Sequence, residues 1–70
     1  MTITPRQQAI LRLVAEGLTH ARIAGELRCS VQTVKNTLGW VYIRLGALNA
    51  PHAVALMDDQ APGWRGDRRL

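Results

Sequence analysis

The residues best suited to chemistry in this 70-residue chain are four polar side chains that lie close together, Gln32, Thr33, Lys35 and Asn36. Their amide, hydroxyl and ammonium groups donate hydrogen bonds, and no carboxylate occurs between positions 30 and 45. Donors of this kind suit the edges of base pairs and the phosphates that flank them. The exposed face of an ordinary helix also carries such residues, so both interpretations are open at this point.

A single helix can present these four side chains together. Ser30 is a good N-cap, because its hydroxyl can accept a hydrogen bond from a first-turn N–H. Apolar residues follow it at three- and four-residue steps, at Val31, Val34, Leu38, Val41 and Leu45. This spacing places them on one helical face. The pattern predicts a helix over residues 31–45 that keeps the polar group on its outer side.

A second helix is expected just before it. Thr19 can cap a helix over about residues 20–28. Only Arg28 and Cys29 separate the last apolar residue of that helix from Ser30. Two helices joined by so short a turn meet steeply, which is the helix-turn-helix arrangement. Cys29 is interpreted as a small apolar residue that fills the corner, and not as a reactive thiol.

Two outer helices complete the expected fold. Thr4 followed by Gln7 has the pattern of a capping box, which predicts a first helix over about residues 5–16. Asn49 can cap a fourth helix, which should fade at Asp58 and Asp59, because acids oppose the dipole at a helix C-terminus. The sequence therefore predicts an all-α fold, a four-helix bundle-like domain with a central helix-turn-helix and no wing.

Charge is distributed unevenly along the chain. Residues 1–57 hold six basic and two acidic side chains, whereas residues 58–70 hold three of each. The basic excess therefore belongs to the predicted domain, residues 1–58, and not to the tail, residues 59–70, which carries helix breakers and is expected to be flexible. A basic domain gives modest support for a polyanionic partner.

Composition and spacing argue against several classes of protein. No apolar run approaches the roughly 18 residues that a membrane span requires, and the N-terminus lacks the pattern of a signal peptide. Cys29 cannot form an internal disulfide, which favours the reducing cytoplasm. His20 and His52 are far apart, and no zinc-binding spacing, phosphate-binding glycine loop or nucleophile elbow occurs. We expect no enzyme activity, no metal and no cofactor.

Several short pieces of the chain occur in a familiar order. They are Ile3-Thr4-Pro5-Arg6-Gln7, the run from Leu11 to Thr19, Ile23-Ala24, Leu27, Ser30, Thr33-Val34-Lys35-Asn36, Leu38, Tyr42, Leu45-Gly46 and Ala53-Val54-Ala55. Over about residues 3–57 this order resembles the LuxR/GerE-type helix-turn-helix. The resemblance implies a four-helix DNA-binding domain whose third helix enters the major groove and whose fourth helix often forms a dimer.

The resemblance also implies roles for single residues. Lys35 and Asn36 match residues that approach bases and phosphates, and Gln32 and Thr33 match the phosphate-contacting start of the recognition helix. Further candidates for the DNA backbone are Thr19, at a helix N-terminus that favours an anion, and the cations Arg22 and Arg44. The expected dimer contacts on the fourth helix are Val54 and Met57.

The chain departs from the family pattern at several positions. Gly39 and Trp40 stand where relatives carry polar or basic side chains. Arg28 replaces a frequent turn glycine, at a cost of order 1 kcal/mol if its φ is positive. An apolar surface results, formed by Trp40, Ile43 and Leu48. Three interpretations of Trp40 stay open: packing beneath the fourth helix or against Trp64, a protein interface, and a DNA contact.

Two hypotheses about function follow. The first is a sequence-specific, dimeric transcriptional regulator that binds double-stranded DNA, a free-standing member of the family without a sensing module. The second is a protein-interaction module that kept the helix-turn-helix scaffold. It would use the surface of Trp40, Ile43 and Leu48 to bind a larger regulator or RNA polymerase. The scaffold also resembles the promoter-reading fourth region of bacterial sigma factors, which supports such a partner.

Overall fold

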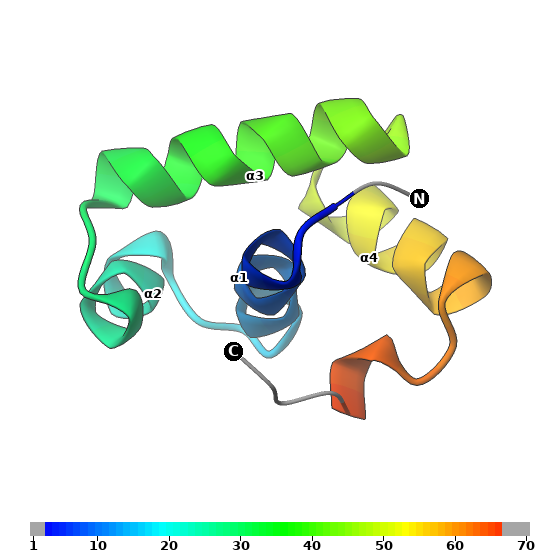
Figure 1. The fold of residues 1–70 in the computed structure, drawn as a ribbon, viewed down its shortest axis with the longest axis horizontal. Coiled ribbons are helices and arrows are strands. Elements are labelled where there is room, and N and C mark those ends of the chain that lie inside the picture. The colour runs from blue at the N-terminus through cyan, green and yellow to red at the C-terminus, as the bar shows by residue number, and fades with distance from the viewer. Residues whose placement is uncertain (1–2, 67–70) are drawn as a thin grey trace.

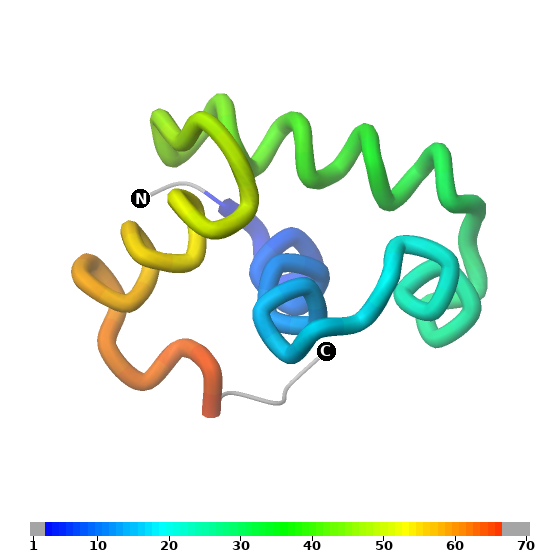
Figure 2. Tube along the Cα trace, turned by 180° about the vertical axis from the view of Figure 1, so that it is seen from behind, coloured from blue at the N-terminus to red at the C-terminus, as the bar shows by residue number. Residues whose placement is uncertain are grey.

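Residues 3–66 are described in the structure, which is a computed structural model, and they form four α-helices and one short 3-10 helix (Figure 1). The elements are α1 (Pro5–Ala15), α2 (His20–Leu27), α3 (Val31–Leu45), α4 (Ala50–Gln60) and η1 (Trp64–Gly66). α1 lies at the centre between α2 and α4, and α3 crosses over it (Figures 1 and 2). The predicted all-α, four-helix fold is confirmed.

A polar side chain caps the start of each α-helix. Oγ1 of Thr4 accepts a hydrogen bond from the backbone N–H of Gln7 at 3.1 Å, and Oε1 of Gln7 accepts one from the N–H of Thr4 at 2.9 Å. The other three caps accept from the N–H three residues further on, and they are Thr19, Ser30 and Asn49. All four predicted caps are therefore present, and each contributes about 1 kcal/mol to helix stability.

The hydrophobic core lies where α2, α3 and α4 pack together with α1. Val34, Leu38 and Val41 of α3 are at most 2% exposed, whereas Val31, at the start of the same stripe, is 38% exposed. The other elements contribute Ile10, Leu11, Ile23, Ala24, Ala53, Met57 and Trp64 to the same cluster. The apolar spacing of α3 thus fixes which of its faces points inward.

The structure corrects the expectation for Met57. This side chain was predicted to contact a second copy of the chain, but it is fully buried in the core. It lies four residues after Ala53, also buried, so both face inward on α4. Of the two predicted dimer contacts, only Val54 retains exposed surface.

The turn between α2 and α3 depends on a strained residue. Arg28 adopts φ 55° and ψ 48°, the left-handed helical region, and it is the one non-glycine residue with positive φ among residues 3–66. This conformation lets the N–H of Cys29 donate to the carbonyl oxygen of Ala24 at 3.0 Å, which closes the end of α2. Because a non-glycine residue adopts this conformation, the turn carries the energetic cost that the sequence predicts for Arg28.

The chain beyond α4 also differs from expectation. The tail was predicted to be flexible from residue 59, but α4 continues to Gln60 and η1 docks Trp64 into the core at 3% exposure. Nε1 of Trp64 donates to Oδ1 of Asp58 at 2.8 Å. Arg65 donates to both oxygens of the same carboxylate, at 3.1 and 2.9 Å. The tail prediction is thus wrong for residues 59–66, and residues 67–70 lie outside the described residues.

Replacing Arg28 by glycine should stabilise the domain. Glycine adopts the left-handed region without a steric penalty, so Arg28→Gly is expected to raise the free energy of unfolding by about 0.5–1 kcal/mol. For a domain of this size 1 kcal/mol corresponds to a rise in Tm of about 4–8 °C, which thermal unfolding followed by circular dichroism measures. Arg28→Ala is the matched control, because alanine keeps the strain; an equal gain in both variants would contradict the explanation.

Acid should release the docked segment. The hydrogen bonds from Arg65, and then from Trp64, hold the pKa of Asp58 below its ordinary value of 3.8. A lowered pKa in the folded state means that the contacts stabilise the docked segment fully above about pH 4 and lose this effect as the pH falls further. In a Trp40→Phe background, the emission of Trp64 should therefore shift to the red below about pH 4. Asp58→Asn should show the shifted emission already at pH 7; a variant that kept the wild-type acid transition would refute the role of Asp58.

Candidate nucleic-acid interface

The outward face of α3 carries a narrow stripe of exposed side chains. Successive residues of a helix are about 100° apart, which puts Gln32, Asn36 and Ile43 within about 30° of the direction opposite the core residues of α3. All three are exposed. The stripe runs along the whole helix, with its polar members in the first two turns and Ile43 in the last.

Two amides on the stripe are joined. Nε2 of Gln32 donates to Oδ1 of Asn36 at 2.9 Å. This hydrogen bond uses one lone pair of the Asn36 carbonyl and leaves its amide N–H groups and a second lone pair for a ligand. An asparagine amide with both functions available can contact the N6 and N7 positions of adenine. The pair thus presents an ordered set of donors and acceptors without a net charge.

Two hydroxyls lie at the N-terminus of the same helix. Oγ of Ser30 accepts a hydrogen bond from the backbone N–H of Thr33 at 3.0 Å. The same oxygen lies 2.9 Å from Oγ1 of Thr33, so one of the two hydroxyls donates a hydrogen bond to the other. The other hydroxyl hydrogen of the pair can donate outward. A phosphate placed at this helix end would also be stabilised by the helix dipole. The geometry therefore suits the backbone role expected of Thr33.

Two cations flank the stripe on opposite sides. Lys35 and Arg44 are both exposed, and each lies about 80–90° around the helix from the Asn36–Ile43 line. They are nine residues apart, which corresponds to about 13 Å along the axis. The sequence of α3 contains no aspartate or glutamate. A polyanion approaching this face meets positive charge on both sides of the polar stripe and no repulsion from the helix itself.

The remaining predicted DNA contacts lie on α2. Thr19 caps this helix, its Oγ1 accepting from the N–H of Arg22 at 3.2 Å, and both residues are exposed. The Thr19 hydroxyl still has its own hydrogen to donate. The structure therefore gathers Gln32, Thr33, Lys35 and Asn36 at one end of α3. It places the other three candidates elsewhere: Thr19 and Arg22 at the start of α2, and Arg44 near the end of α3.

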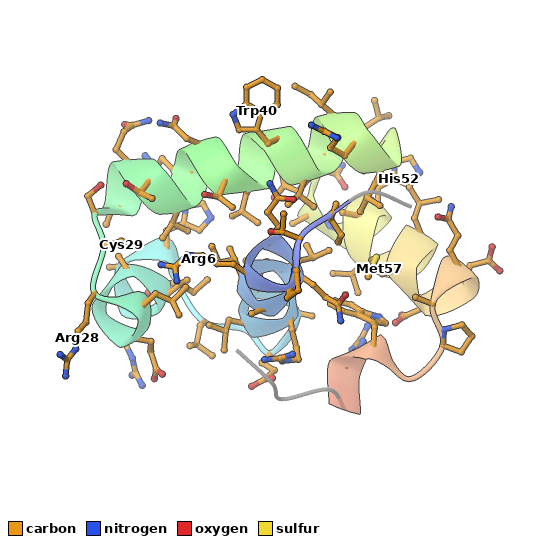
Figure 3. The ribbon with its side chains drawn as sticks, viewed as in Figure 1. Arg6, Arg28, Cys29, Trp40, His52 and Met57 are labelled. Atoms are coloured by element: carbon orange, nitrogen blue, oxygen red, sulfur yellow. The ribbon has the colours of Figure 1, made fainter. Side chains whose placement is uncertain are left out.

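The predicted apolar surface is exposed. Trp40 is 58%, Ile43 71% and Leu48 86% exposed. Trp40 points away from the body of the molecule, above α3, while η1 with Trp64 lies at the opposite edge (Figures 1 and 3). Packing of Trp40 in the core or against Trp64 is therefore wrong, and the two interpretations that require an exposed side chain remain.

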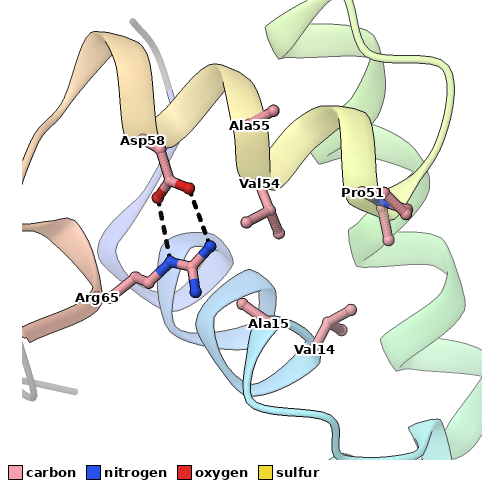
Figure 4. A pocket seen from close by; sticks show the side chains of 8 residues that line it. Val14, Ala15, Pro51, Val54, Ala55, Asp58 and Arg65 are labelled. Carbon is pink, nitrogen blue, oxygen red and sulfur yellow. Dashed lines mark hydrogen bonds and ion pairs between the residues drawn. The ribbon is translucent and has the colours of Figure 1, made fainter.

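A separate apolar groove lies between α1 and α4. Val14 and Ala15 form one wall, and Pro51 and Val54 form the other. The Asp58–Arg65 ion pair lines the same groove (Figure 4). Val54, a predicted dimer contact, is half-buried there. The groove offers a shallow surface of small apolar side chains.

Two polar contacts that support this scaffold escaped the sequence analysis. Arg12 of α1 is 4% exposed, and its Nε lies 4.0 Å from Oε2 of Glu16. Nδ1 of His52 accepts a hydrogen bond from the N–H of Leu48 at 3.1 Å, which orders the turn before α4. The four-residue spacing of Arg12 and Glu16 was a usable signal for the first contact. The contact between Leu48 and His52 had no such signal, because it reaches back from the helix to the turn.

Residues 3–66 contain no group of three or more His, Cys, Asp or Glu side chains that could hold a metal ion. Among the same residues no helix is both long and apolar enough to cross a membrane. Cys29 is partly buried against the core, as expected for a small apolar residue at the corner.

Comparison with known proteins identifies the family. The model of the GerE family, described as bacterial regulatory proteins of the luxR family, matches residues 1–57. The chain belongs to this family. α2 and α3 are the helix-turn-helix of a LuxR-type DNA-binding domain, so the predicted family and fold are both confirmed. No solved structure matches the chain significantly.

Curated relatives carry the same kind of domain. A protein of Mycobacterium tuberculosis strain H37Rv is 40% identical over 60 residues, and one of Mycobacterium bovis is 38% identical over 60 residues. Both bear the provisional name of HTH-type transcriptional regulators. The matched region covers 86% of this chain but only 6% of either relative. The likeness therefore concerns the helix-turn-helix domain alone.

Proposed function

We propose that this chain is a sequence-specific transcriptional regulator that binds double-stranded DNA as a dimer, in the cytoplasm and without enzyme activity. The observation that carries the proposal is the outward face of α3. There a joined amide pair lies between two exposed cations, on the second helix of a LuxR-type helix-turn-helix. Amides distinguish bases and cations neutralise phosphates, so this face has both functions that DNA recognition needs.

In this proposal α3, the recognition helix of about residues 31–45, lies in the major groove. Asn36 contacts bases, and Lys35 approaches both the bases and a flanking phosphate. The DNA backbone is contacted by Gln32, Thr33, Thr19, Arg22 and Arg44. The second copy of the chain packs on the groove between α1 and α4, where Val54 retains exposed surface. Small apolar side chains let two such helices approach closely.

Selection from random duplex DNA tests the proposal. The purified chain is mixed with a random pool at about 150 mM salt, a concentration that suppresses contacts made only to phosphates. The expected result is an enriched motif of two inverted half-sites whose centres are about ten base pairs apart. A pool that stays random after repeated rounds would refute sequence-specific binding, and a motif with one half-site would refute the dimer.

Two substitutions on α3 should have different effects on the selected site. Lys35→Ala removes a phosphate-neutralising cation, so it should weaken binding of all sequences and lower the salt slope of log K by about one. Asn36→Ala removes base contacts, so it should cost about 1–3 kcal/mol on the selected site while leaving the salt slope unchanged. Fluorescence anisotropy over a series of salt concentrations measures both. Equal salt slopes in the two variants would contradict the assignment.

A second candidate function is protein binding through Trp40, Ile43 and Leu48. The observation that favours it is their exposure, at 58%, 71% and 86%, because exposed large apolar side chains that gather on one surface are typical of interaction sites. In this case Trp40→Ala should abolish binding to purified bacterial RNA polymerase and leave the helical content intact. Undetectable binding of the unmodified chain to polymerase would remove this partner.

A further inference from the structure

A shallow hollow interrupts the outward face of α3. Five residues line it, Lys35, Asn36, Gly39, Trp40 and Ile43. Its composition changes along the helix. An ammonium and an amide border it toward the N-terminus, and an indole and a branched aliphatic side chain border it toward the C-terminus. Gly39 lies between the two halves and contributes no side chain.

Nothing in the fold itself explains a glycine at position 39. Its φ is not positive, so the backbone conformation is open to any residue. A Cβ built there meets no atom within 4 Å outside the helix, so no close approach of another element excludes a side chain. Glycine destabilises the interior of a helix relative to alanine. The empty position is therefore better explained by a ligand that fills it than by packing within the domain.

The hollow lies on the same line as the predicted base contacts. Asn36 and Ile43 differ by about 20° around the helix and by about 10 Å along its axis. Base pairs are about 3.4 Å apart, so a helix that lies along the major groove with Asn36 against one base pair brings Gly39, Trp40 and Ile43 over base pairs up to about three steps away. Leu48 follows the end of α3 and does not belong to this line.

Charge favours DNA over a protein as the occupant of the hollow. Lys35 and Arg44 stand on either side of the line, and α3 has no carboxylate. Phosphates on both edges of a groove would meet these cations when the apolar end of the stripe faces the base edges. Indole and aliphatic side chains offer base edges chiefly apolar contact. The apolar group exposed in the major groove is the C5-methyl of thymine.

We infer that Gly39, Trp40 and Ile43 form a receptor for a thymine methyl group and so help to determine which DNA sequence this chain prefers. The inference rests on the proposed DNA-binding function and deepens it. The methyl group occupies the space that a side chain at position 39 would fill, with Trp40 and Ile43 on its sides. The preferred half-site then contains a thymine within a few base pairs of the position contacted by Asn36.

The test replaces each thymine of the selected half-site by deoxyuridine, one position at a time. This change removes the methyl group and preserves base pairing. Burial of one methyl group corresponds to about a fourfold change in affinity, so deoxyuridine at one position should raise the Kd of the full chain about fourfold. A second pair of sites carries cytosine or 5-methylcytosine at that position, opposite guanine. The site with 5-methylcytosine should bind more tightly than the site with cytosine, since it restores the methyl group on the major-groove side.

Three variants assign the effect to the hollow. Ile43→Ala removes one wall, and Gly39→Ala fills the floor, so in both the ratio of the Kd values for deoxyuridine and thymine should approach one. Leu48→Ala is the matched control, because it removes a more exposed apolar side chain away from the line, and it should keep the fourfold ratio. Circular dichroism checks that each variant has the helical content of the unmodified chain.

Each alternative outcome is distinguishable. A selected motif in which every thymine tolerates deoxyuridine would overturn the inference and leave the proposed function standing. The absence of any selected motif would overturn both. If the unmodified chain self-associates without DNA, and Ile43→Ala prevents this without changing the deoxyuridine ratio, the surface is a protein interface and the inference is overturned.

Discussion

The packing of α3 across α1 is the constraint on which the rest of the molecule depends. Val34, Leu38 and Val41 are buried together, and this fixes the rotation of the helix about its own axis. Each deletion of such a buried aliphatic side chain costs several kcal/mol, so the rotation is strongly determined. The opposite face, with Asn36 and Ile43, consequently points to solvent whatever its own composition. Residues on this face can therefore vary without loss of the fold.

The steep turn before α3 fixes the angle between α2 and α3. A short connection places α2 beside the N-terminal end of α3, so that Thr19 and Arg22 belong to the same motif as the polar end of the stripe (Figure 1). The left-handed conformation of Arg28 is part of the cost of this turn, and Cys29 and Leu27 help to offset it by packing against the core. A strained residue persists where the surrounding packing determines it, and here that packing also orients the binding helices.

Local signals in the sequence predicted most of the helical framework. The caps at Thr4 and Ser30 act within four residues, and the apolar period of α3 reports a single face, so both could be recognised without a structure. The burial of Met57 and the docking of Trp64 could not. They depend on how far α4 extends and on which partner Asp58 finds seven residues later, and neither is contained in a periodic pattern. The exposure of Trp40 stayed open for the same reason, because it depends on where the tail lies.

For the candidate interface, residue types were predictable but their coupling was not. The sequence indicated Gln32 and Asn36 as separate contacts, whereas the structure joins them by a hydrogen bond. Under the proposed function, affinity and specificity have different origins on this domain. The exposed cations Arg22, Lys35 and Arg44 give at most about three neutralised phosphates, which corresponds to a salt slope near −3 for one copy. That is a weak basis for binding at physiological salt. Two copies on paired half-sites would double the electrostatic contribution, and uncharged contacts along α3 would supply discrimination that salt does not screen.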